Sequence, residues 1–272
     1  MSRLAIIIPV YKPDFLKEAL ECLAAQTCKD FTVYVGDDCS PHPLSEIVMP
    51  FKEKMNLHYT RFDSNLGAKD LIGQWERCVA LAQDEEWLWL FSDDDQMDSN
   101  CVASFYRMLQ LNPDQRLFHF NVTVIDSEGK PTTDKRFVKK DFDQWLSASD
   151  FLKQRLTYKV NSFVVEYIVH RKTFEQQGGF VRYPLAWCSD DATWYRMGKP
   201  SGILTIPDAR IYWRKSEANI TPNRSSSVQK QKLKAVTQFL KFCFQELGIS
   251  SLPAIFNYYL HALYQARSIF RL

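Results

Sequence analysis

At 272 residues the chain is long enough to bury a full hydrophobic core, and a single α/β domain of this size is common. Charged residues make up 24% of the chain, and no helix or loop concentrates the basic residues behind the net charge of +2, which argues against nucleic acid as a partner. The seven cysteines are scattered without a C-x-x-C pair, which argues against a disulfide framework or a zinc site and favours a reducing compartment.

The first half of the chain alternates strands and helices. Residues 4–9, LAIIIP, form a continuous apolar run of the kind found in buried parallel strands. Because the chain enters this strand directly, we expect no signal peptide. We expect Asp14 to cap the helix that follows. Further strands are predicted at residues 31–35, 58–62 and 87–91, with helices at 43–54 and 68–83 between them. This alternation predicts βαβ units and an α/β fold built on a parallel sheet.

The second half is less regular. Strands are predicted at residues 117–125, 162–170, 203–206 and 209–213, with a turn at 126–129. A helix is predicted at 142–156, another enters near Thr193, and residues 213–227 read as a loop. Two helices at 228–247 and 253–271 close the chain, because Gly248 suits a helix end and Pro253 a first helical turn. No segment has the length and apolarity of a membrane span.

Three consecutive acids, Asp93, Asp94 and Asp95, follow the apolar run WLWLF of the fourth strand. Adjacent like charges repel one another, and a hard cation such as magnesium or manganese is their natural counter-charge, usually shared with the phosphates of a substrate. The alternative is a solvated acidic turn that caps a helix beginning near Ser99. The triplet alone leaves both interpretations open.

Two other acidic pairs accompany this triplet. Asp37 and Asp38 close the second strand, and the carboxyl ends of parallel strands meet at one edge of a sheet, so the pair is expected near the triplet. Asp190 and Asp191 lie in an aromatic-rich loop, where partly apolar surroundings can raise the pKa of a carboxyl group and suit it to general-base catalysis. As isolated residues, all four acids would more often form a turn or a helix cap.

The combination of these segments closely resembles the start of family 2 glycosyltransferases of the GT-A fold. The resemblance rests on LAIIIPVY at residues 4–11, ALECLAAQT at 19–27, FTVYVGDDCS at 31–40, NLG at 65–67 and FSDDD at 91–95. A looser match to the acceptor side of that family consists of GGF at 178–180, the acids Asp190 and Asp191, and Arg196. The resemblance as a whole covers roughly residues 3–215 and implies a Rossmann-like, mostly parallel central sheet flanked by helices.

The resemblance implies a role for each site residue. Pro9, Tyr11 and Asp38 fall where the family holds the nucleotide base, with Asp37 beside it, and Asn65 and Gly67 belong to the donor-binding set. Asp93 and Asp95 match the ends of a D-x-D motif that binds ribose and metal, and Asp94 lies between them. The general base is Asp190 or Asp191, with Asp190 favoured because Arg196 follows it by the family's interval of six residues.

The sequence therefore predicts an inverting, metal-assisted transfer of a sugar from a nucleotide-diphosphate sugar, a UDP-sugar in the first instance, to the hydroxyl of a saccharide or lipid-linked saccharide. The implied cofactor is Mn2+ or Mg2+, and the implied setting is surface-polysaccharide assembly in a bacterial cytoplasm. Residues 1–224 would form the GT-A domain, with a nucleotide-sugar-binding half at 1–112 and an acceptor-binding half at 113–224. Residues 225–272 would form a helical extension. Two roles are left open for it: peripheral contact with the inner face of the cytoplasmic membrane, or association between copies of the chain.

Two alternatives remain at this point. One is a sugar-nucleotide nucleotidyltransferase, which normally needs a glycine-rich loop in the first βα turn, where this chain has PVYKP at residues 9–13. The other is a catalytically inactive GT-A homologue that serves as a binding subunit.

Overall fold

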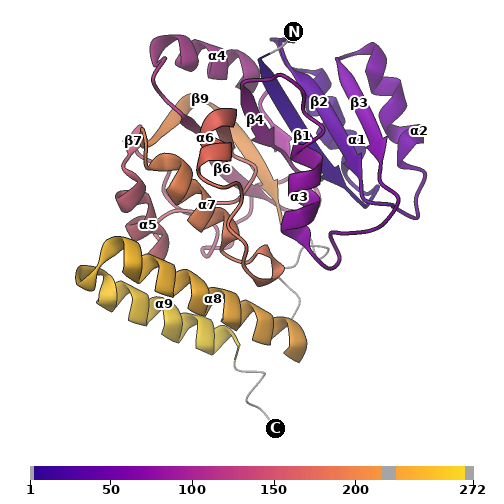
Figure 1. The fold of residues 1–272 in the computed structure, drawn as a ribbon. Helices are drawn as coiled ribbons and strands as arrows, with labels where there is room; N and C mark the ends of the chain where they lie inside the picture. The colour runs from indigo at the N-terminus through magenta and orange to yellow at the C-terminus, as the bar shows by residue number, and fades with distance from the viewer. Residues whose placement is uncertain (1–2, 216–224, 267–272) are drawn as a thin grey trace.

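The structure, a computed structural model, describes residues 3–215 and 225–266, and within these residues nine strands form one sheet (Figure 1). The sheet has the order β3-β2-β1-β4-β8-β6-β9-β5, and β7 pairs with β9. The strands are β1 (Leu4–Val10), β2 (Thr32–Asp37), β3 (Leu57–Arg61), β4 (Trp87–Leu90), β5 (Gln96–Met97), β6 (Leu117–Ile125), β7 (Trp145–Leu146), β8 (Tyr167–His170) and β9 (Ile203–Arg214).

Helices cover both faces of this sheet. They are α1 (Leu16–Ala24), α2 (Leu44–Val48), α3 (Leu71–Val79), α4 (Cys101–Leu111), α5 (Ala148–Leu156), α6 (Arg171–Gln176), α7 (Ser189–Gly198), α8 (Ser226–Leu247) and α9 (Leu252–Gln265), with short 3-10 turns η1 (Met49–Glu53), η2 (Pro184–Ala186) and η3 (Ile249–Ser251). Side chains alternate along β1: Leu4 and Ile6 enter the core beneath α1, α2 and α4, whereas Ala5 and Ile7 enter the core beneath α3, α5 and α7.

The predicted α/β fold is confirmed. Among themselves, the four strands β1 to β4 pair only in parallel, as the continuous apolar runs predicted. In the second half β8 runs antiparallel between β4 and β6, and β6 and β9 return to a parallel pairing. The predicted turn after β6 is present, with Gly129 at a φ of 80°.

Several local predictions are wrong. The strands predicted at 203–206 and 209–213 are one strand, β9, which stays paired with β6 through a register shift after Phe120. The helix predicted from 142 begins only at Ala148, where the Ser147 side chain caps it, and β7 precedes it. The strand predicted from 162 begins at Tyr167. Asp14 does not cap α1, whose first turn has no side-chain cap.

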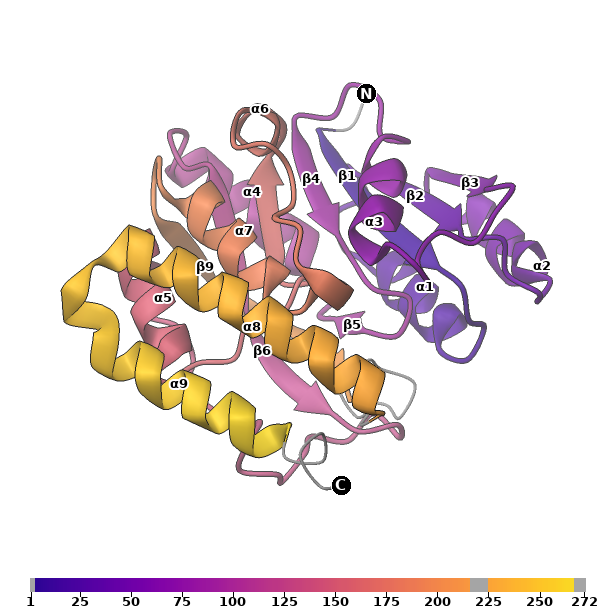
Figure 2. The same cartoon turned by 60° about the horizontal axis from the view of Figure 1, so that its bottom comes forward.

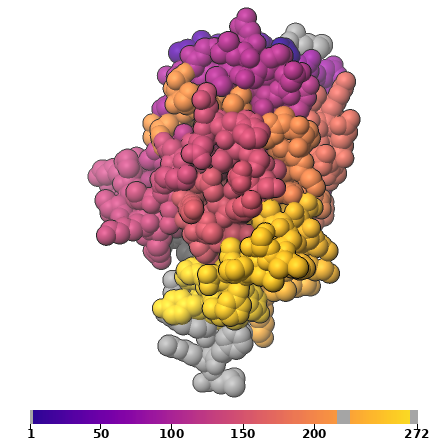
Figure 3. Space-filling view, turned by 90° about the vertical axis from the view of Figure 1, so that its left-hand side faces the viewer, coloured from indigo at the N-terminus to yellow at the C-terminus, as the bar shows by residue number. Residues whose placement is uncertain are grey.

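The last two helices form a hairpin along one side of the molecule, below α5 and α7 (Figures 1 and 2). Gly248, at a φ of 72°, ends α8, and Pro253 lies in the first turn of α9, as predicted. A side view shows this C-terminal hairpin, α8 and α9, packed directly against the segment at residues 113–215 (Figure 3). Residues 216–224 of the predicted loop and 267–272 of the last predicted helix lie outside the described residues.

All seven cysteines are described and all are free, in agreement with the predicted absence of a disulfide framework. Among the described residues, no helix combines the length and the apolarity that crossing a bilayer requires.

Candidate active site

A cavity of about 570 Å3 opens at the carboxyl ends of β1, β2 and β4. β2 and β3 lie on one side of β1, and β4 lies on its other side, so the direction of strand addition reverses at β1. Open α/β folds bind ligands at such a switch point. The walls are largely apolar, with Phe15, Leu71 and Trp75 on one part and Val164 and Trp213 on another. Seven of the predicted site residues line it: Pro9, Tyr11, Asp38, Asn65, Gly67, Asp93 and Asp94.

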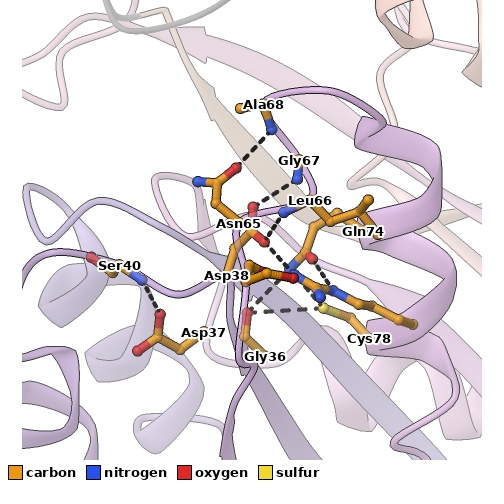
Figure 4. Close-up of polar contacts among 12 residues, drawn as sticks. Gly36, Asp37, Asp38, Ser40, Asn65, Leu66, Gly67, Ala68, Gln74 and Cys78 are labelled. Atoms are coloured by element: carbon orange, nitrogen blue, oxygen red, sulfur yellow. Dashed lines mark hydrogen bonds and ion pairs between the residues drawn. The ribbon is translucent and has the colours of Figure 1, made fainter.

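Asp38 fixes the turn that forms one wall of this cavity (Figure 4). Its carboxylate accepts hydrogen bonds from the N–H groups of Leu66 at 2.7 Å and Gly67 at 2.8 Å, and it pairs with the guanidinium of Arg77. Asn65 completes the turn, since its side-chain oxygen accepts a hydrogen bond from the N–H of Ala68 at 3.1 Å. The 65–68 turn is therefore held to the end of β2 by one buried carboxylate.

Asp37 points the opposite way along the same strand, as successive strand residues do (Figure 4). It is fully buried, and its carboxylate accepts hydrogen bonds from the N–H of Ser40 at 2.8 Å, the hydroxyl of Tyr59 at 2.5 Å and Arg61 at 2.9 Å. Asp37 is not among the residues lining the cavity. Its contacts hold the end of β2 to β3. The predicted contact between Asp37 and a nucleotide stays a prediction, and the position of Asp37 outside the cavity does not favour it.

The three acids after β4 occupy two environments. Asp93 and Asp94 are half-buried in the cavity wall, and burial, followed by the charge of Asp94, raises the pKa of Asp93 to about 7. Asp95 lies behind them, fully buried, and burial raises its pKa well above the usual value. The alternative of a solvated cap is wrong, because no side chain caps α4 and Asp95 is excluded from solvent.

Arg214, at the end of β9, donates hydrogen bonds to two of these three acids. Its backbone N–H donates to Asp95 Oδ1 at 2.6 Å, and its guanidinium donates to the carbonyl oxygen of Asp94 at 2.8 Å and pairs with Glu18 at 2.7 Å. Asp95 Oδ2 has no hydrogen-bond partner among the described residues. A buried oxygen without a partner is costly, which marks this atom as a position for a bound group.

Asp190 and Asp191, the predicted general-base pair, also occupy two different environments. Both lie in the first turn of α7, beyond the cap position, so neither caps the helix. Asp191 is buried and binds Arg155 through both oxygens, at 2.6 and 3.1 Å. Asp190 is half-buried, and burial followed by the charge of Asp191 raises its pKa to about 7, while Arg155 opposes this shift. A carboxyl group that titrates near neutrality is suited to accept a proton.

Sequence reasoning missed two charged residues of this region. Arg155 was overlooked because its partner, Asp191, is 36 residues away in the chain. Glu166 is fully buried: its Oε1 accepts a hydrogen bond from the N–H of Phe163 at 2.6 Å, its Oε2 has no partner among the described residues, and burial raises its pKa to about 8. It interacts electrostatically with both Asp95 and Asp190. The available signal was an acid directly before the apolar stretch YIVH.

The solved structures similar to this chain include glycosyltransferases of GT-A type. Staphylococcus aureus TarS, residues 1–349 in complex with UDP-GlcNAc, aligns with a TM-score of 0.65 at 15% identity over 98% of this chain and 82% of that one. The mannosyltransferase PcManGT from Pyrobaculum calidifontis, in complex with GDP-Man and Mn2+, aligns with a TM-score of 0.62 at 15% identity over 98% of this chain and 73% of that one. At this identity the similarity shows the fold, and it confirms the GT-A prediction.

The chain belongs to glycosyl transferase family 2, whose family model matches residues 5–174. Among curated proteins, the poly(ribitol-phosphate) beta-N-acetylglucosaminyltransferase TarS of Staphylococcus aureus is 34% identical over 98 residues, which is 35% of this chain and 16% of that protein. The succinoglycan biosynthesis protein ExoW of Rhizobium meliloti is 44% identical over 48 residues, 17% of this chain and 15% of that protein. The aligned part thus spans less than a fifth of either relative. Family membership rules against the nucleotidyltransferase alternative.

Proposed function

We propose that this protein transfers a sugar, with inversion at the anomeric carbon, from a nucleotide-diphosphate sugar to an acceptor hydroxyl. The observation that carries the proposal is the cavity at the carboxyl ends of β1, β2 and β4, which brings together Asp38, the 65–68 turn, Asp93 and Asp94 in a family 2 chain. The separate pair Asp190 and Asp191 supplies an acid of suitable pKa on the acceptor side.

The donor would bind in this cavity. Pro9, Tyr11 and the turn held by Asp38 are proposed to contact the nucleoside, with Asp93 and Asp94 near the ribose and the diphosphate. The similar solved structures carry UDP-GlcNAc in one case and GDP-Man in the other, which supports a nucleotide sugar as donor. We propose a UDP-sugar first.

The residues present fit a divalent cation, Mn2+ or Mg2+. Asp95 Oδ2 is buried and without a partner among the described residues, and Asp93 lies two positions earlier on the cavity wall. Among the described residues, no group of three or more acidic, histidine or cysteine ligands is gathered. A cation held here would take its remaining ligands from a diphosphate and from water. Such a cation would neutralise the negative charge that develops on the departing diphosphate.

Asp190 is our proposed general base. Asp191 is already neutralised by Arg155 in a bidentate pair, whereas Asp190 remains half-buried with a pKa of about 7. Its carboxylate would accept the proton of the acceptor hydroxyl, which makes that oxygen nucleophilic, and assistance of this kind typically contributes about 10²–10⁴-fold. A single attack opposite the leaving group inverts the anomeric configuration.

The setting that we propose is surface-polysaccharide assembly at the cytoplasmic face of a bacterial membrane. Both curated relatives bear names from polymer biosynthesis. The outer face of α9 supports a peripheral membrane contact, because Leu252, Phe256, Leu260 and Tyr264 recur every four residues and are each at least 46% exposed. The protein should co-sediment with liposomes of anionic lipid. This co-sedimentation should be lost in the double variant Phe256→Ser, Leu260→Ser. Binding that persists in this variant, or a dimer that occupies this face instead, would contradict the contact.

The extent of each part is also a proposal. We assign residues 1–112 to donor binding, 113–224 to the acceptor side and 225–272 to the extension. Deleting residues 225–272 tests this division, and donor binding should survive it.

The test of the reaction is a thermal-shift screen of nucleotide sugars with Mn2+ and Mg2+. The native donor should raise the melting temperature only when metal is present. Asp95→Asn should abolish this metal-dependent shift, whereas Asp190→Asn should keep it and lose turnover. Comparing the turnover of Asp191→Asn with that of Asp190→Asn shows which of the two acids is the base. The matched control is Asp63→Asn, which changes an exposed acid on the loop after β3. Full transfer by all three site variants would refute the mechanism, and donor binding without turnover in the wild type would indicate an inactive binding subunit.

A further inference from the structure

The turn that leads into α7 is held in a strained backbone conformation. Leu185, Ala186 and Cys188 have φ values of 59°, 55° and 61°, in the left-handed region that residues with a Cβ avoid. Three such residues within four positions, ending two residues before Asp190, cost conformational free energy. A backbone of this kind persists only where its surroundings over-determine it.

The C-terminal hairpin supplies much of that surrounding structure. Lys232 of α8 is only 7% exposed, which is uncommon for lysine, and its ammonium lies 4.5 Å from the ring centre of Trp187. On α9, the hydroxyl of the buried Tyr258 lies 3.7 Å from Cys188 Sγ, and its ring stacks on Tyr158 at 4.9 Å with an interplanar angle of 7°. Both helices of the hairpin therefore contact the 184–188 turn.

The same hairpin also holds the far end of α7. Glu246 of α8 accepts a hydrogen bond from the hydroxyl of Tyr195 at 2.9 Å and pairs with Lys199 at 2.9 Å. The ring of Tyr195 meets Phe242 edge to face at 5.4 Å. The helix that carries Asp190 is thus fixed at both ends by residues 232–258, a segment that lies beyond the region matched by the family model.

We propose that the C-terminal hairpin is a positioning device: through Lys232 and Tyr258 it holds the strained 184–188 turn so that Asp190 faces the acceptor. This inference rests on the proposed function, because it takes Asp190 as the base. The hairpin residues touch neither donor nor acceptor in this account. They act through the turn, so that their loss would change turnover and leave donor binding as it is.

The first test needs no acceptor. Amide hydrogen exchange is measured on the full chain for the wild type, Lys232→Met and Tyr258→Phe, with Lys241→Met, an exposed lysine on the same helix, as the matched control. We expect exchange of the amides of residues 185–190 to rise about tenfold in the two hairpin variants, with β1 to β4 and the control unchanged. Unchanged exchange in the turn would overturn the inference.

The second test separates strain from packing. Leu185→Ala removes the side chain but keeps the Cβ that makes the left-handed region unfavourable, whereas Leu185→Gly removes both. Compared with Leu185→Ala, Leu185→Gly should melt at the same or a higher temperature, bind the donor selected by the screen equally well, and turn over about 10- to 100-fold more slowly. Equal turnover in the two variants would show that the strain serves only the fold.

The two proposals can fail separately. If Asp190→Asn retains transfer activity, the base assignment falls, whatever the hairpin does. If Asp190→Asn is inactive while Lys232→Met, Tyr258→Phe and Leu185→Gly turn over like the wild type, only the positioning role is refuted.

Discussion

Replacing Gly67 by alanine probes the contact that holds the donor-side turn. A Cβ at this position would lie 2.8 Å from Asp38 Oδ2 and 3.5 Å from Gln74 Cγ. Asp38 cannot withdraw without cost, because its carboxylate holds the N–H groups of Leu66 and Gly67 and the guanidinium of Arg77. Overpacking of this kind costs about 1–3 kcal/mol. We expect Gly67→Ala to lower the free energy of unfolding by that amount and to weaken donor binding, since Gly67 lines the cavity.

The same contact predicts a strong coupling between Gly67 and Asp38. Asp38→Ala alone removes one partner of a buried ion pair, which costs about 3–5 kcal/mol. It also removes the atom that obstructs the new methyl group, so adding Gly67→Ala should then cost almost nothing. The double variant should be more stable than the sum of the single effects by about 1–3 kcal/mol, within the range measured for residues in contact.

Urea unfolding of the wild type, both single variants and the double variant closes this cycle. Asp63→Ala, which removes an exposed acid nearby, is the control, and Gly67→Ala should cost the same in its presence as in the wild type. The slope of unfolding against urea must stay constant across the set for the comparison to hold. Additivity of Gly67→Ala and Asp38→Ala to within about 0.5 kcal/mol would show that the two residues do not meet as described.

Three further predictions concern the other acids. Asp37→Asn should lower the free energy of unfolding by about 1–3 kcal/mol, because a hydrogen bond to a charged group is lost. The thermal shift caused by the donor should stay unchanged. A loss of donor binding without a loss of stability would instead support the predicted contact between Asp37 and the nucleotide. Turnover should fall about tenfold per pH unit below about pH 7, where Asp190 takes up its proton, and a flat pH profile would exclude it as the base. Glu166 has a folded-state pKa raised from 4.5 to about 8, so its contribution to stability is present below about pH 4.5 and is lost as the pH rises through about 8. Glu166→Gln should therefore flatten the decline of the melting temperature across that window, and an unchanged decline would contradict its burial as an acid.

The sequence was most informative where one strand carries its own signal. The apolar runs that became β1, β2 and β4 each end in polar residues, and parallel strands bring those ends to one edge, so Asp38 and the Asp93–Asp94 pair could be placed together in advance. The 65–68 turn followed from NLG in the same way. These features depend on local composition and on a rule that holds for every parallel sheet.

The remaining features depend on contacts between distant residues. Asp37 and Asp38 are adjacent and chemically identical, and only the packing of β2 against β3 decides which one turns away from the cavity. The choice between Asp190 and Asp191 rests on Arg155, which lies on α5 and is 36 residues from Asp191 in the chain. The continuity of β9 across Pro207 was hidden because a strand that shifts its register against β6 has no regular alternation to detect.

The hydrogen bond from the Arg214 backbone to Asp95 joins residues separated by 119 positions. The carboxylate cluster after β4 therefore cannot reach its final arrangement when the first half of the chain has folded. It must wait until β9 has been added beside β5 and β6. During synthesis from the N-terminus, β1 to β4 can assemble early, but the acids remain without their support until nearly four-fifths of the chain has emerged. We therefore expect the proposed donor site to reach its final geometry only after β9 is in place.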